Sequence, residues 1–139
     1  MSQTVTPMIS YQDAAAALDW LSRAFGFREV TRIMMPDGSV GHGELATPEG
    51  GLIMLAEPTP DYRSPRRHAE TCADADKWLS VPYVVDGVHV YVADLDAHFA
   101  VARDAGATVL APPRDTGHGR AYTVADPEGH RWMFEQLPR

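Results

Sequence analysis

The fold is decided by the stretch Asp126-Pro-Glu-Gly-His-Arg-Trp-Met-Phe-Glu135, near the C-terminal end of the chain. Asp126-Pro-Glu-Gly129 predicts a turn, because proline restricts one backbone angle and glycine tolerates the left-handed region. Residues 130–136 are rich in strand-forming side chains and predict a strand after this turn. Since residues 119–125 predict a strand before it, the stretch predicts two adjacent antiparallel strands.

Upstream of this hairpin, the second half of the chain begins with a strand over residues 87–93. A helix over residues 94–105 follows, with Asp94 or Asp96 as its N-cap and Gly106 as its stop. Residues 107–110 predict a strand that Pro112-Pro113 breaks. The second half therefore has the order β-α-β-β-β.

The first half of the chain has the same order of elements. Asp13 is the expected N-cap of its helix and Gly26 the expected C-terminal stop. The strands are expected over residues 4–10, 27–35, 39–46 and 52–56. The repeated order predicts an internal duplication.

The length of 139 residues suits a single domain with two modules. We expect module one over residues 1–57, a linker or lid over 58–86, and module two over 87–139. The linker carries four prolines, and a short helix is expected over residues 69–79. Such a segment is too long to be structureless inside so small a domain, so it is expected to cover the sheet or to contact a partner.

Composition narrows the classes of partner. The net charge of −7 predicts no binding to nucleic acid, because no basic stripe is present to neutralise phosphates. The short cluster of Arg63, Arg66 and Arg67 is interpreted as a solvated surface. A lone cysteine, Cys72, allows no internal disulfide, and no signal peptide or membrane-spanning run is recognisable. A cytoplasmic protein is expected.

Two motifs together carry a resemblance to a known family. The ending Asp126-Pro-Glu-Gly-His-Arg-Trp132 and the opening Tyr11-Gln-Asp … Ala24-Phe-Gly-Phe27 resemble those of the vicinal oxygen chelate superfamily, the glyoxalase, bleomycin-resistance and dioxygenase proteins. The resemblance covers nearly the whole chain except residues 57–86. It implies an α+β fold in which two βαβββ modules form a half-open barrel around a pocket. It also implies a homodimer.

The resemblance also implies where a metal would bind. The four ligand positions of metal-dependent members fall near Thr6, Met54, Gly87 and Met133. None of these is His, Glu, Asp or Cys, and methionine thioethers are too soft for a hard divalent ion. The expectation is therefore a protein without a metal cofactor.

An alternative metal site lies two residues further along each strand of module two. That shift of about 6.6 Å keeps the same face and reaches His89 and Glu135. His42 or Glu44, on a strand of module one, would supply a third donor. This alternative predicts a divalent metal and a lyase, isomerase or dioxygenase activity.

Strand alternation predicts the lining of the pocket. His89 and Tyr91 are expected on the concave face, whereas Trp132 and Phe134 are expected on the opposite face, against a helix. Thioethers adapt in shape and phenols add hydrogen bonds, so this lining suits a flat or irregular small organic ligand, although each methionine is equally compatible with a role in the core. The predicted ligand-binding residues are Met8, His42, Glu44, Met54, His89, Tyr91, Tyr122, Met133 and Glu135.

The sequence thus leaves two hypotheses about function. The first is a metal-free small-molecule-binding protein of the bleomycin-resistance kind, which sequesters a drug or metabolite. The second is the metal-dependent enzyme built on the displaced site. No serine nucleophile motif is present, and whether the protein is an enzyme stays open.

Overall fold

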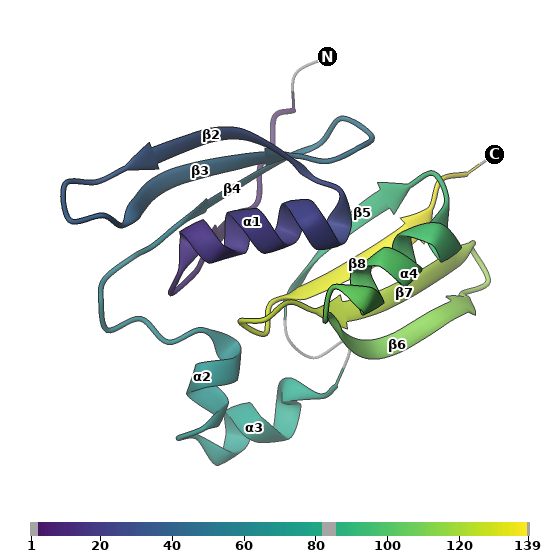
Figure 1. The fold of residues 1–139 in the computed structure, drawn as a ribbon. Coiled ribbons are helices and arrows are strands. Elements are labelled where there is room, and N and C mark those ends of the chain that lie inside the picture. Colours follow the sequence, from purple (N-terminus) through teal and green to yellow (C-terminus); the bar gives the residue numbers. More distant parts are fainter. Residues whose placement is uncertain (1–2, 82–85, 139) are drawn as a thin grey trace. The chain divides into compact units, whose positions relative to one another are not determined.

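The computed structural model describes residues 3–81 and 86–138. The chain divides into two compact units, Met1–Tyr62 and Arg63–Arg139, and each is built on one four-stranded sheet (Figure 1). None of the helices in the described ranges combines the length and the apolar character that crossing a bilayer requires.

The first unit has the predicted order β-α-β-β-β. Its strands lie side by side in the order β1-β4-β3-β2, with β1 parallel to β4 and the other neighbours antiparallel. This arrangement confirms the predicted module, although β1 is shorter than expected. The elements are β1 (Met8–Ser10), α1 (Ala14–Phe25), β2 (Arg28–Met34), β3 (Val40–Ala46) and β4 (Leu52–Ala56).

Helix α1 begins and ends where the sequence predicted. The Asp13 carboxylate accepts a hydrogen bond from the backbone N–H of Ala16 at 3.0 Å, and Gly26 ends the helix in the left-handed region with φ of 71°. The apolar face of α1 packs closely on the sheet at Gly43 of β3. A Cβ atom there would lie 3.2 Å from the Leu18 side chain, so glycine permits the close approach.

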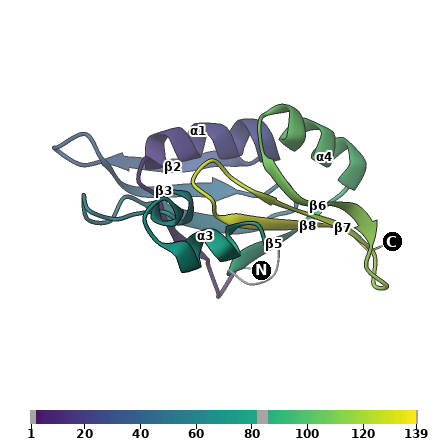
Figure 2. The same cartoon turned by 90° about the horizontal axis from the view of Figure 1, so that it is seen from below.

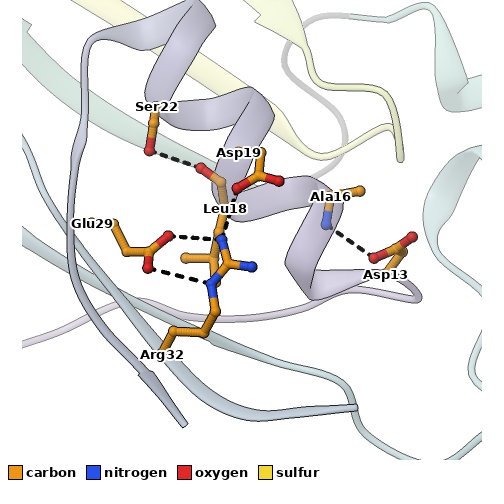
Figure 3. A network of polar contacts seen from close by, with 7 residues as sticks. All are labelled: Asp13, Ala16, Leu18, Asp19, Ser22, Glu29 and Arg32. Atoms are coloured by element: carbon orange, nitrogen blue, oxygen red, sulfur yellow. Dashed lines mark hydrogen bonds and ion pairs between the residues drawn. The ribbon is translucent and has the colours of Figure 1, made fainter. Parts of the chain in front are cut away.

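An ion-pair network fastens α1 to β2 on the same face of the sheet (Figure 3). The Arg32 guanidinium on β2 lies 2.7 Å from the Asp19 carboxylate on α1 and 2.7 Å from the Glu29 carboxylate. Hydrogen bonds from these two carboxylates, Glu29 first, raise the pKa of Arg32. The helix therefore covers one face of this sheet, and no described element of the first unit covers the opposite face.

The second unit repeats the β-α-β-β-β order after two short helices. Its strands lie in the order β5-β8-β7-β6, with β5 parallel to β8. Asp94 is the N-cap of the long helix, since its carboxylate accepts the N–H of Ala97 at 3.2 Å. The elements are α2 (Pro65–Ala69), α3 (Ala73–Leu79), β5 (Gly87–Val92), α4 (Leu95–Asp104), β6 (Thr108–Asp115), β7 (Arg120–Ala125) and β8 (Arg131–Gln136).

One sequence expectation about this unit is wrong, and another needs new bounds. Strand β6 does not stop before Pro112-Pro113 but continues to Asp115. Its pairing with β7 shifts in register between Ala111 and Arg114, so the prolines occupy an irregularity on an edge strand, where their missing N–H groups cost no ladder bond. The short helix expected over residues 69–79 is present as α3, which starts later than expected, and a separate helix α2 precedes it and ends at Ala69.

The Asp126 carboxylate organises the turn between β7 and β8. Its Oδ1 atom accepts the backbone N–H groups of Glu128 at 3.1 Å and His130 at 3.0 Å, and its Oδ2 atom accepts the indole N–H of Trp132 at 3.0 Å. Asp126 is only 1% exposed, and Trp132 is fully buried. One buried side chain therefore fixes both the turn and the first residues of β8.

The segment that precedes β5 docks on the same turn. The backbone N–H of Arg66 donates to the carbonyl of Glu128 at 3.0 Å, and a Cβ atom on Gly129 would lie 2.8 Å from that nitrogen. Arg131, which is 2% exposed, donates from its guanidinium to the carbonyls of Trp78, Leu79 and Val81. Residues 65–81 therefore belong to the second unit, while residues 82–85 lie outside the described ranges.

Replacing Asp126 tests its role in the fold. We expect Asp126→Ala to lower the free energy of unfolding by about 2–4 kcal/mol, because it leaves two backbone N–H groups and a buried indole N–H without their acceptor. Asp126→Asn is the matched control: it keeps an acceptor for the backbone but places an amide against the indole N–H, so about half of that loss is expected. Urea unfolding measures both values, and an Asp126→Ala protein as stable as the native one would contradict this role.

Candidate ligand-binding site

The sheet of the second unit has one face covered by a long helix and an opposite face that α4 does not reach. Helix α4 lies over the first face, and α3 lies on the other side of the sheet (Figure 2). Phe134 of β8 packs against His98 of α4, with ring centroids 4.4 Å apart. Strand register places His89, Tyr91, Met133 and Glu135 on the opposite face, here called the open face of sheet 2.

Tyr122 does not lie on this open face, so its predicted placement is wrong. It pairs with Phe134 across β7 and β8 and therefore shares the helix-covered face. Its side chain is fully buried, and its hydroxyl lies 2.6 Å from Nδ1 of His98. Burial raises the pKa of Tyr122. The sequence misled because the glycine-rich loop before β7 does not reveal the register of that strand.

His89 and Glu135 are in contact on the open face of sheet 2. Nε2 of His89 lies 2.9 Å from a carboxylate oxygen of Glu135, and the two side chains are 41% and 17% exposed. The sequence predicted that they share a face; the parallel register, with His89 opposite Met133 and Tyr91 opposite Glu135, makes them diagonal neighbours. The Tyr91 ring stands edge-on to the imidazole, with centroids 4.8 Å apart.

A second histidine–carboxylate pair lies on the sheet of the first unit. Nε2 of His42 is 2.8 Å from a carboxylate oxygen of Glu44, both on β3. Met54 pairs with Glu44 on one side and with Met8 on the other, so these four side chains share the face opposite α1, here called the open face of sheet 1. Met8 is 81% exposed, which makes it a surface residue rather than core.

The donors within each unit do not fit a metal centre. Of the four positions implied for metal ligands, Met54 and Met133 face the open sides of the sheets as thioethers, and the backbone of Gly87 lies opposite Arg131 rather than Met133. Across the described ranges, no three His, Cys, Asp or Glu side chains gather where they could hold an ion. Each histidine–carboxylate pair supplies two donors, and a divalent ion rarely binds firmly to two.

One charged residue on the open face of sheet 2 was not predicted from the sequence. Arg114 of β6 pairs with Ala121 of β7, and Ala121 pairs with Glu135 of β8. Because directly paired residues share a face, Arg114 lies on the open face of sheet 2, at its β6 edge. Arg114 donates to the Ala121 carbonyl at 3.3 Å and has no carboxylate partner among the described residues. It was missed because β6 was expected to end at Leu110, before the prolines.

A separate pocket of about 450 Å³ lies in the first unit, at the turn between β2 and β3. It contains two acidic residues, Asp37 and Glu57, and none of the predicted ligand-binding residues. Hydrogen bonds from the Ser39 side chain and backbone lower the pKa of Asp37, and Glu57 accepts the N–H of Val40 at 2.7 Å. Its lining comes from separate turns, which no sequence motif connects. The lining residues are Tyr11, Gln12, Asp37, Gly38, Ser39, Glu57, Pro58, Thr59, Pro60 and Tyr62.

The chain matches known proteins in sequence as well as in fold. The sequence model of the Glyoxalase/Bleomycin resistance protein/Dioxygenase superfamily matches residues 4–134. The chain belongs to this superfamily. Both its predicted fold class, α+β with two βαβββ modules, and its predicted family are thereby confirmed.

Two relatives above 30% identity match almost the full chain. An uncharacterized protein of Mycobacterium bovis is 33% identical over 136 residues, which are 97% of this chain and 84% of that protein. The crystal structure of TioX from Micromonospora sp. ML1 is similar with a TM-score of 0.70 and 31% identity, covering 97% of this chain and 98% of TioX.

TnmS3, described as an antibiotic binding protein from Streptomyces sp. CB03234, is similar in fold. Its crystal structure gives a TM-score of 0.68 at 19% identity and covers 99% of this chain and 98% of TnmS3. At that identity the likeness shows the fold alone.

Replacing Tyr122 tests its place beneath α4 in this superfamily member. We expect Tyr122→Phe to lower the free energy of unfolding by about 1 kcal/mol, because it removes the hydroxyl bonded to His98 and keeps the packed ring. Affinity for an aromatic probe such as Nile red is expected to stay unchanged, since the ring does not reach the open face. Urea unfolding and a fluorescence titration measure the two quantities. Weaker probe binding at unchanged stability would place Tyr122 in the ligand site after all.

Proposed function

We propose that this protein binds a small, flat organic ligand on the open face of sheet 2 and sequesters it without a metal ion. The observation that carries the proposal is the chemistry of the open face of sheet 2. There an exposed tyrosine, a methionine and a histidine–carboxylate pair lie on one face of a rigid sheet. Aromatic and thioether groups supply adaptable apolar contact, and the polar pair supplies direction.

The relatives support a binding role. TnmS3 is described as an antibiotic binding protein, and the superfamily includes bleomycin resistance proteins. TioX has the same fold as this chain and is 31% identical to it in sequence. We infer that this chain acts on the same class of ligand, a drug or a metabolite of drug-like size, in the cytoplasm.

The metal-dependent alternative requires more donors than one pair supplies. A lyase, isomerase or dioxygenase built on His89 and Glu135 needs a third protein ligand, for which the sequence offers His42 or Glu44. In the structure His89 bonds Glu135, and His42 bonds Glu44. Each pair thus supplies two donors, and no third donor gathers with either pair among the described residues, which favours the metal-free proposal.

We also propose that the protein works as a homodimer. Strand β2 is an edge of its sheet, and its end exposes Ile33, Met34 and the following Met35 to 52%, 49% and 47%. An edge strand with adjacent apolar side chains favours pairing with another surface. We propose a second copy of this chain as that surface, because most oligomers of soluble proteins are symmetric assemblies of identical chains.

Binding without metal is tested with Nile red, an uncharged planar aromatic dye. We expect the chelator-treated protein to bind the dye as tightly as untreated protein, because no ion takes part. Met133→Glu is expected to weaken binding about tenfold, since it places a charge within the apolar contact. Val101→Glu is the matched control, because Val101 is 53% exposed on α4, away from the open face. Fluorescence titration measures each affinity.

Metal analysis of the same samples distinguishes the two hypotheses. Protein that retains about one equivalent of nickel, zinc, iron or manganese, and loses it in His89→Ala, would support the enzyme instead. Dye affinity that falls on chelation would point to the same conclusion.

The dimer is tested by sedimentation. Native protein is expected to sediment at twice the monomer mass of 15.2 kDa, and Ile33→Lys is expected to shift it to the monomer. Val101→Lys adds the same charge on α4 and is expected to leave the dimer intact. A native protein that sediments as a monomer at micromolar concentration would contradict the proposal.

A further inference from the structure

The imidazole of His89 uses only one of its two ring nitrogens within the protein. Nε2 is bonded to Glu135 at 2.9 Å, whereas Nδ1 has no hydrogen-bond partner among the described residues. The ring is 41% exposed, while the Glu135 side chain behind it is 17% exposed. His89 therefore stands between a shielded carboxylate and the space above the sheet.

The partner of Nε2 decides what the other nitrogen can do. An ionised carboxylate only accepts hydrogen bonds, so the contact with Glu135 requires the hydrogen of the neutral ring to be on Nε2. Nδ1 then carries a lone pair and acts as an acceptor. The open face of sheet 2 thus carries a hydrogen-bond acceptor on a half-exposed ring that the contact with Glu135 holds in place.

The neighbours of His89 hold this orientation and define the kind of group that would meet it. The Tyr91 ring stands edge-on to the imidazole at 81°, and Met133 lies directly opposite His89 in the sheet. Both offer apolar surface for an aromatic ring. Arg114 lies on the same face, aligned with Glu135 but two strands away on β6. Its guanidinium adds positive charge there and has no carboxylate partner in the described ranges.

We propose that the ligand carries an acidic aromatic hydroxyl, and that this hydroxyl donates its hydrogen bond to Nδ1 of His89. The inference rests on the proposed function and specifies the class of ligand for the same face. A phenol matches this arrangement, because its O–H donates to Nδ1 and its ring contacts Tyr91 and Met133. Glu135 is a positioning residue, because it selects the tautomer without touching the ligand.

The experiment compares 4-nitrophenol with nitrobenzene, which has the same ring and nitro group but no hydroxyl. Native protein is expected to bind 4-nitrophenol about tenfold more tightly, the gain of one well-placed hydrogen bond. The absorbance of bound 4-nitrophenol is expected to shift toward that of the phenolate at a pH where the free dye is mostly protonated. The hydroxyl proton moves toward Nδ1 of His89, and the Glu135 carboxylate on Nε2 stabilises the resulting imidazolium. Titration calorimetry and absorbance spectra measure both effects.

Three variants assign the effect to the pair. His89→Gln is expected to bind both compounds within about twofold of each other and to lose the phenolate shift, while it keeps its affinity for nitrobenzene. Glu135→Leu is expected to lose part of the preference, because Nε2 then has no acceptor and the tautomer of the ring is no longer fixed. His68→Gln is the matched control: His68 is exposed on α2, and its replacement is expected to change nothing.

The failures of the two proposals are distinguishable. If native protein binds nitrobenzene and 4-nitrophenol equally, or if His89→Gln keeps both the preference and the spectral shift, the assignment of a phenol is overturned while the binding function stands. If native protein binds neither compound nor Nile red, the proposed function falls with it. A Glu135→Leu protein with the full preference would overturn the positioning role of Glu135.

Discussion

The buried carboxylate of Asp126 is the constraint on which the second unit depends. It accepts two backbone N–H groups of its own turn and the indole N–H of Trp132, so it fixes where β8 begins and which of its residues face α4. Strand β8 lies between β5 and β7, and its register sets the neighbours on both sides. The contact between His89 and Glu135 is therefore a consequence of a turn several residues away.

The same turn explains why the segment before β5 belongs to the second unit. A glycine at position 129 lets the backbone of α2 approach within hydrogen-bonding distance of the turn. Arg131 then binds the last carbonyls of α3, and burial lowers the pKa of its guanidinium. Among the described residues, the Arg131 guanidinium is bonded to backbone carbonyls and to no carboxylate. The carbonyls that converge at the C-terminal end of α3 therefore stabilise this buried cation in place of an ion pair.

In each unit, the two faces of the sheet carry different kinds of side chain. The helix-covered faces hold the buried aromatic and aliphatic residues that make the core. The open faces hold methionines, a tyrosine and two histidine–carboxylate pairs, several of them exposed or half-buried. Because fold and function are only loosely tied, side chains on the open faces can change while the residues on the helix-covered faces keep the fold.

The sequence by itself determined the two βαβββ modules, the N-cap of the first helix and the family, because caps, turns and strand patterns are local signals. It left the N-cap of the second helix open between Asp94 and Asp96, and the structure shows Asp94. It also placed His89 and Glu135 on one face, since alternation along a strand is local too. The sequence placed Tyr122 on the wrong face and ended β6 too early, so that Arg114 was not predicted to lie on a strand. The alternation of apolar and polar residues does not reveal a register shift or the length of a loop.

Only the tertiary structure decided that the His89 ring meets Glu135 at hydrogen-bond distance. These residues are 46 positions apart, and no hairpin joins β5 to β8, so their parallel register is set by packing across the whole sheet and by the Asp126 turn. The direction of a single ring nitrogen therefore follows from long-range contacts that no local pattern encodes.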